Sequence, residues 1–181
     1  MKKTLLLLLL LTAFCPSFAN KIIVDKVENG LRFVQTKPTS HVFAVWETLT
    51  DGGIELQCYQ NMNIKEIKLY HLVIYHYFDI EEGSRLLLKM ENDSIMELRS
   101  MLHSFTIDRS FTYTIYSVSE EQLQELMNNN VVKIRVETES GNKDSKVYGK
   151  MFSKTIAKDY KLIEETLLKE VPKEKTFYDD F

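Results

Sequence analysis

Five residues of this sequence could act as a nucleophile, a base or a metal ligand: Cys58, His41, His71, His76 and His103. A thiol near a histidine can act as a nucleophile, but the neighbours of Cys58 match no nucleophile elbow or papain-like pattern. His71 and His76 are five positions apart in a segment typical of a strand, so they point to opposite faces. No H-x-H, H-E-x-x-H or C-x-x-C spacing occurs. The sequence therefore predicts no catalytic residue, no metal site and no cofactor, and we interpret Cys58 as a small buried side chain.

Electrostatic binding is a second kind of chemistry that the sequence allows. At about 100° per residue, Lys150, Lys154, Lys158 and Lys161 fall within one arc of an expected C-terminal helix. This lysine ridge is suited to anionic lipid headgroups, an acidic glycan or an acidic protein. The alternative is a solvated helix face whose lysines serve solubility, and Glu165 in the same arc favours that alternative.

Ring stacking on a ligand is the third candidate chemistry. Trp46 and Tyr116 are the aromatic residues that we expect at the surface, where they can contact a sugar or another ligand. The other rings are more simply explained as core residues. Trp46, Tyr116 and the four lysines of the ridge are thus the candidate ligand-binding residues.

The first 19 residues have the pattern of a secretory signal peptide. Two lysines follow Met1, Leu5–Leu11 form an apolar run, and Ser17-Phe18-Ala19 form a small-x-small ending. The apolar stretch is shorter than the roughly 20 residues that span a bilayer. We therefore expect cleavage before Asn20, no transmembrane segment in the mature chain, and a periplasmic or extracellular location.

Cys15 raises the alternative of a lipoprotein anchor, because a cysteine after an apolar run can be lipidated. Bacterial lipoproteins usually carry Gly, Ala or Ser before that cysteine, and here the residue is Phe14. Cleavage after Ala19 is therefore the favoured interpretation.

The mature chain has the size and charge of one globular domain. Removing the leader leaves 162 residues, with Cys58 as the single cysteine and thus no internal disulfide. The formal charge becomes −5, since the leader holds two lysines and no acidic residue. This charge disfavours nucleic acid as a partner. We expect a single domain over residues 20–171 and a flexible tail over 172–181.

Most of the chain up to residue 118 has the pattern of short strands. Asn29-Gly30 between two β-rich runs predicts a tight hairpin, and Asp51-Gly52-Gly53 suggests a second turn. Residues 69–78 are apolar at both odd and even positions, which predicts a central strand covered on both faces. The expected strands are 22–27, 31–36, 42–49, 54–59, 69–78, 85–90, 95–98 and 111–116.

The periodicity changes after residue 118. Ser119 and Gln122 form a capping box that predicts a short helix. A strand over 131–137 and a polar loop over 141–145 follow. Residues 149–171 then carry an apolar stripe at helical spacing, ended by Pro172.

These elements predict an α+β fold: a mainly antiparallel sheet, sandwich-like or strongly curved, with a short helix and a long C-terminal helix packed on it. The segment from Ser119-Glu120-Glu121-Gln122-Leu123 to Val131–Thr138 resembles small exported proteins of Gram-negative bacteria that have no assigned function. The resemblance covers about the last third of the chain and implies no site residues.

The sequence favours an exported, non-enzymatic domain of the cell envelope that binds a protein or polymer partner. An envelope protein, a glycan and an anionic lipid surface are the candidate partners. The alternative is an exported hydrolase whose site is assembled from separate strands.

Overall fold

A computed structural model of the chain describes residues 20–45, 50–108 and 111–172. The expected leader, the end of the expected tail and Trp46 lie outside this part. Within it, the chain forms one antiparallel sheet of eleven strands and two helices. The elements are β1 (Ile22–Glu28), β2 (Leu31–Thr36), β3 (Thr39–Val45), β4 (Thr50–Asn61), β5 (Lys68–His76), β6 (Arg85–Met90), β7 (Ile95–Arg99), β8 (Phe105–Asp108), β9 (Phe111–Val118), α2 (Glu120–Asn128), β10 (Val131–Thr138), β11 (Gly141–Val147) and α3 (Met151–Leu167).

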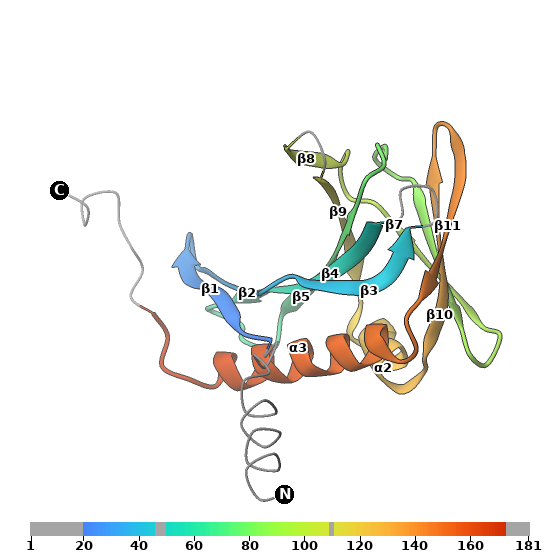
Figure 1. The fold of residues 1–181 in the computed structure, drawn as a ribbon. Coiled ribbons are helices and arrows are strands. Elements are labelled where there is room, and N and C mark those ends of the chain that lie inside the picture. The colour runs from blue at the N-terminus through green and yellow to red at the C-terminus, as the bar shows by residue number, and fades with distance from the viewer. Residues whose placement is uncertain (1–19, 46–49, 109–110, 173–181) are drawn as a thin grey trace, which may run out of the picture.

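The sheet is strongly curled. Its main strand order is β7-β6-β10-β11-β3-β4-β5-β9-β8, and β4 is long enough to pair with β3 at one end and β2 at the other. Ser100, just after β7, forms a bridge with Tyr116 of β9, so distant parts of the strand order meet. The antiparallel α+β fold expected from the sequence, in its strongly curved form, is thus confirmed (Figure 1).

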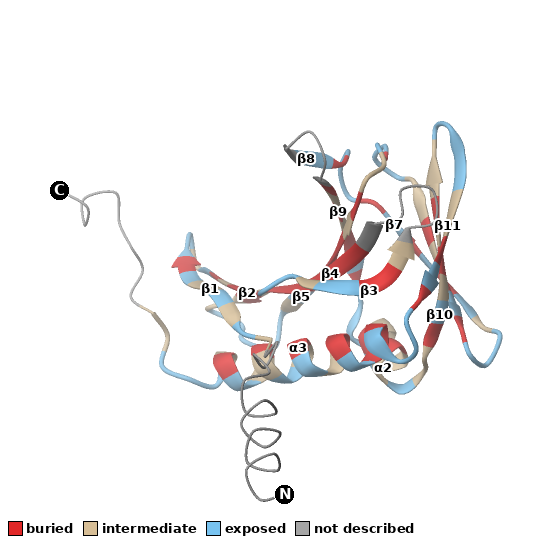
Figure 2. Ribbon diagram, in the orientation of Figure 1, coloured by how far each residue is buried: buried red, intermediate tan, exposed pale blue. Residues whose placement is uncertain are grey.

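Helix α3 lies along one side of the sheet and contacts β2, β3 and β4 (Figure 1). The buried Phe152, Ile156 and Ile163 belong to the same core as Ile54 and Leu56 of β4. Buried and exposed stretches alternate along α3 as its turns face the sheet or the solvent (Figure 2). The apolar stripe read from the sequence is therefore the docking surface of this helix.

Local turn and cap signals are confirmed at two places. Asn29 and Gly30 have φ of 51° and 74°, and Glu28 pairs with Leu31, which defines a two-residue hairpin turn. At the start of α2, Ser119 Oγ accepts a hydrogen bond from the backbone nitrogen of Gln122, whose side chain accepts from the Ser119 nitrogen. The turn and the capping box each form from contacts between residues close in the sequence, and the tertiary structure keeps both.

The expected turn at Asp51-Gly52-Gly53 is wrong, because both glycines lie within β4. Gly52 pairs with Phe43 of β3, and a Cβ at residue 52 would lie only 2.0 Å from Cε2 of that ring. Gly53 is similarly close to Thr39, at 2.8 Å from its carbonyl oxygen. The glycines permit close approach of β3 to β4 rather than a reversal of the chain.

Two other boundaries differ from the sequence-based expectation. Residues 141–145 belong to strand β11, where Asp144 pairs with Arg135 of β10 and only Ser145 and Val147 are buried. Helix α3 ends at Leu167 instead of Val171. Arg32, a buried arginine of β2, donates hydrogen bonds to the last carbonyls of the helix, those of Thr166 and Leu167, so these carbonyls have partners without a further helical turn.

Candidate binding face

The structure places the candidate ligand-binding residues in three different situations. Trp46 lies outside the described residues. Tyr116 was expected at the surface, and this is wrong, because the ring is fully buried in the core. The curl of the sheet turns Thr112, Thr114 and Tyr116 of β9 inward, while Tyr113 on the other face is half-buried. Burial raises the pKa of the Tyr116 hydroxyl.

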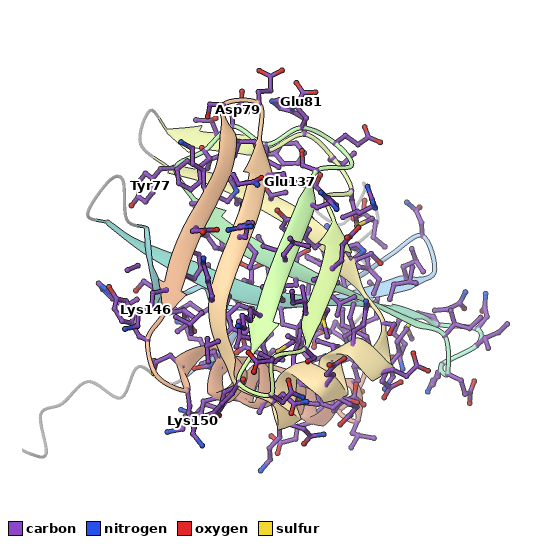
Figure 3. All side chains as sticks on the ribbon, turned by 90° about the vertical axis from the view of Figure 1, so that its right-hand side faces the viewer. Tyr77, Asp79, Glu81, Glu137, Lys146 and Lys150 are labelled. Atoms are coloured by element: carbon purple, nitrogen blue, oxygen red, sulfur yellow. The ribbon has the colours of Figure 1, made fainter. Side chains whose placement is uncertain are left out.

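The four lysines of the ridge are all exposed along α3, as expected. Lys150 occupies the N-cap position, and Lys161 lies 3.7 Å from Glu165. Figure 3 shows Lys150 at the end of the molecule opposite Asp79, with Lys146 at an intermediate height. Exposure is compatible with both interpretations of the ridge, so ligand contact by these lysines stays a prediction.

Cys58 is buried on the helix-facing side of β4, and burial raises its pKa to about 12. A thiol in this state is protonated at neutral pH and unreactive as a nucleophile. His76 is also buried, which lowers its pKa to about 4. One ring nitrogen contacts Thr114 Oγ1 at 2.7 Å and the other accepts from the Phe78 nitrogen at 3.1 Å, so His76 has a structural role.

One group of side chains contains a serine, a histidine and an aspartate. Asp79 Oδ1 lies 2.9 Å from both Ser104 Oγ and His103 Nε2. The serine hydroxyl also accepts a hydrogen bond from the backbone nitrogen of Ile80 at 3.0 Å. Because the hydroxyl donates to the aspartate and not to the histidine, the arrangement lacks the nucleophile–base contact of a catalytic triad. Among the described residues, no group of three or more His, Cys, Asp or Glu could hold a metal ion.

A row of aromatic rings crosses the sheet on the face opposite α3. The first group consists of Phe33 on β2, Tyr59 on β4 and His71 on β5, with ring centroids 4.6 and 5.1 Å apart. The second consists of Tyr75 on β5, Tyr113 on β9 and Phe105 on β8, with centroids 5.9 and 5.2 Å apart. Each ring meets its neighbour across a strand boundary, which is how side chains stabilise a sheet. We call the surface formed by these six rings and the residues between them the aromatic face.

A buried carboxylate lies on the same face of the sheet and contacts one of the six rings. Glu55 lies on β4 with no exposed surface, and its oxygens accept hydrogen bonds from Gln35 (2.8 Å), Gln57 (2.7 Å) and the Tyr75 hydroxyl (2.7 Å). Burial raises its pKa, and the three hydrogen bonds oppose that rise. The carboxylate therefore holds the side chains of Tyr75, Gln35 and Gln57 in place. Because it is buried, it presents no charge to a partner.

Exposed aliphatic side chains extend the aromatic face at one end. Leu69 of β5 pairs with Tyr59 and is 59% exposed. Leu31 lies at the start of β2, and Ile64 and Ile67 lie in the loop between β4 and β5, with exposures of 43, 51 and 48%. Asn61 of β4 pairs with Leu31 and accepts from the Ile64 nitrogen, so the loop and the start of β2 are neighbours. Clustered exposed apolar side chains of this kind mark interaction sites.

The outer surface of β6, β7, β10 and β11 is different in character, being covered by ion pairs across the strands (Figure 3). Arg135 and Lys133 both contact Asp144, at 2.6 Å, and Arg85 contacts Glu137. Such exposed pairs contribute little to stability. They make this side of the molecule a charged and solvated surface.

The sequence analysis missed the aromatic face, although one signal for it was present. On β4 the amide of Gln57 and the ring of Tyr59 occupy alternate positions, and on β5 the rings of His71 and Tyr75 do so too, with Val73 between them. That alternation places them on one face of their own strands. Which strands are neighbours was needed to join them into one surface.

No family model, curated protein sequence or solved structure matches this chain. In the part of the chain that the structure describes, no helix has the length and apolar character needed to cross a bilayer.

Proposed function

We propose that the protein is an exported, non-enzymatic domain that binds another protein through the aromatic face. The observation that carries this proposal is the half-buried ring row with exposed Leu31, Ile64, Ile67 and Leu69 at its end. Protein interfaces are enriched in aromatic side chains and depleted of charge at their centre. Glu55, a carboxylate at the centre of this face, is buried and hydrogen-bonded, so it presents no charge to a partner.

A protein partner fits this face better than a glycan. The rings lean against one another, with interplanar angles of 31° for Phe33–Tyr59 and 21° for Phe105–Tyr113. Their flat sides are thus partly occupied, which leaves less ring surface for a sugar to stack on. Exposed aliphatic side chains such as Leu69 favour an apolar protein surface instead.

The size of the face favours a weak or transient complex. From β2 to β8 it measures about 19 Å at roughly 4.8 Å per strand, and from Leu69 to Tyr75 about 20 Å at roughly 3.3 Å per residue. The product is roughly 400 Å², about half of what each partner contributes to a standard stable interface. We therefore expect affinity in the micromolar range, unless neighbouring loops add to the contact.

Export is the second part of the proposal. It is supported by the signal-peptide pattern of residues 1–19 and by the resemblance of the segment after Ser119 to small exported proteins. The hydrolase alternative has less support, because Cys58 is buried with a raised pKa and Ser104 donates to Asp79 instead of a base.

The test compares two exposed aliphatic positions, one on the aromatic face and one on a strand that carries none of its rings. A photo-crosslinking amino acid replaces Leu69 on the aromatic face or Ile95 on β7, which is 63% exposed. In the organism that encodes the protein, we expect a discrete adduct from position 69 and none from position 95. With the identified partner purified, Leu69→Asp should weaken binding at least tenfold, and Ile95→Asp should leave it unchanged. Equal adducts from the two positions, or equal affinities of the two Asp variants, would refute this role of the face.

A further inference from the structure

Asp159 is a buried carboxylate whose hydrogen-bond partners among the described residues carry no charge. It lies on α3 with no exposed surface. Its Oδ1 accepts from the side-chain amide of Asn20, and its Oδ2 contacts Thr36 Oγ1 at 3.1 Å. The Thr36 hydroxyl also lies 3.2 Å from the Leu56 carbonyl, so Asp159 shares its single proton with another acceptor. A buried anion supported in this way is under-compensated.

The charged groups around Asp159 do not correct this deficit. Lys158, its neighbour on α3, lowers the pKa of Asp159, while Glu55 on β4 raises it. Burial dominates, and the pKa rises to about 6. Lys158 is exposed on the solvent side of the helix, whereas Asp159 points inward. Within residues 20–45, 50–108 and 111–172, no cation therefore lies against the carboxylate.

We propose that cleavage after Ala19 converts the backbone nitrogen of Asn20 into the cation that pairs with Asp159. The inference rests on the proposed export. The Asn20 side-chain amide already contacts Asp159, and only Cα, Cβ and Cγ separate that amide from the backbone nitrogen. Hydrolysis adds water across the Ala19–Asn20 peptide bond: the carboxylate leaves with the leader, and the nitrogen gains a proton to become an ammonium group.

This pairing would make processing a step that completes the fold. Before cleavage the nitrogen is an uncharged amide, and after cleavage it is an amine with an ordinary pKa of about 8, protonated at neutral pH. The new charge lies where β1 begins and α3 crosses β2, so it fastens the first strand to the C-terminal helix. The precursor is therefore expected to unfold more readily than the mature protein.

The experiment uses the exported, processed protein and a chemical change at its α-amino group. Sequencing of its first residues tests export and the cleavage position. Selective acetylation of the α-amino group near pH 6.5 then removes the charge, and urea unfolding at pH 7 is compared for the parent and for Asp159→Asn. We expect acetylation to lower the urea midpoint of the parent and to leave that of Asp159→Asn unchanged.

A second measurement separates the ion pair from a general effect of the modification. The rate of acetylation as a function of pH gives the pKa of the α-amino group, which should be higher in the parent than in Asp159→Asn. An Asn20 terminus with equal midpoints and equal pKa values in the two proteins would overturn the ion pair and leave export standing. A mature terminus at any other residue would overturn both the cleavage position and this inference.

Discussion

Arg32 offers the sharpest test of how this fold is held together. Its side chain has no exposed surface, and its guanidinium makes two parallel bonds to Asp25, Nε to Oδ1 at 2.9 Å and Nη2 to Oδ2 at 2.8 Å. It also donates to the carbonyls of Thr166 (3.0 Å), Leu167 (3.3 Å) and Lys169 (3.3 Å). One side chain thus connects the first hairpin to the end of α3, where the negative pole of the helix favours a cation.

Arg32→Ala removes all of these contacts at once. The carboxylate of Asp25, mostly shielded at 24% exposure, loses its partner, and the carbonyls of Thr166, Leu167 and Lys169 lose a charged donor, although the Thr166 carbonyl still accepts from the Lys169 nitrogen. Breaking a buried ion pair on one side costs about 3–5 kcal/mol, and a hydrogen bond to a charged group makes a net contribution of about 1.5–3 kcal/mol. Water that enters the truncated site offsets part of this loss. Because water can reach part of Asp25, we expect a loss of about 4 kcal/mol in the free energy of unfolding.

Urea unfolding followed by circular dichroism measures this loss, and Arg32→Lys is the matched control. Lysine keeps the charge but cannot form the two parallel bonds, so it should recover only part of the stability. The double variant Arg32→Ala with Asp25→Ala should be more stable than Arg32→Ala alone, because the unpaired carboxylate is gone. A loss below about 1 kcal/mol for Arg32→Ala would refute the reasoning that this residue joins the hairpin to the helix.

Three further predictions concern the core and its titration. Ile163→Asp should lower the free energy of unfolding by about 4 kcal/mol or more, because it places a charge in the buried contact between α3 and the sheet. The exposed Lys158→Glu should change it by only about 0.5 kcal/mol. Equal urea midpoints for the two variants would contradict the docking of this helix. Tyr116→Phe should leave the free energy of unfolding unchanged or raise it by about 1 kcal/mol, because the buried hydroxyl makes no hydrogen bond of normal geometry. A large drop in the midpoint temperature of thermal unfolding would show that the hydroxyl has a partner. In the Nα-acetylated protein, Asp159 has a folded pKa of about 6 against about 3.8 unfolded, so its contribution to stability falls by about 2 kcal/mol as the pH rises from 4 to 7. This part of the slope should be absent in Asp159→Asn, and identical pH profiles of the urea midpoint would contradict the assignment.

Elements specified by adjacent residues could be predicted from the sequence. The Asn29-Gly30 turn needs two residues that tolerate positive φ, and the capping box at Ser119 needs only a hydroxyl and an amide three positions apart. The buried stripe of α3 follows from helical spacing in the same way. These features were predicted because their stabilising contacts lie within a few residues of each other.

Features that depend on strand neighbours could not be predicted. Gly52 looked like part of a turn, and only the ring of Phe43 packed against it shows why a strand needs glycine there. Residues 141–145 lack an apolar alternation, yet they form β11 because their backbone pairs with β10 on one side and, at Ser145, with β3 on the other.

The sequence by itself determined which residues share a face of each strand, while the tertiary structure decided which face is inside and which strands lie side by side. On β9 the alternation separates Tyr113 from Thr114 and Tyr116, and the curl of the sheet buries the threonine side, where Thr114 bonds to His76. The aromatic face has the same origin, because its rings come from five strands and meet only through pairing. The physical reason is that the two-residue period of a strand is a local property, whereas burial depends on contacts between segments far apart in the chain.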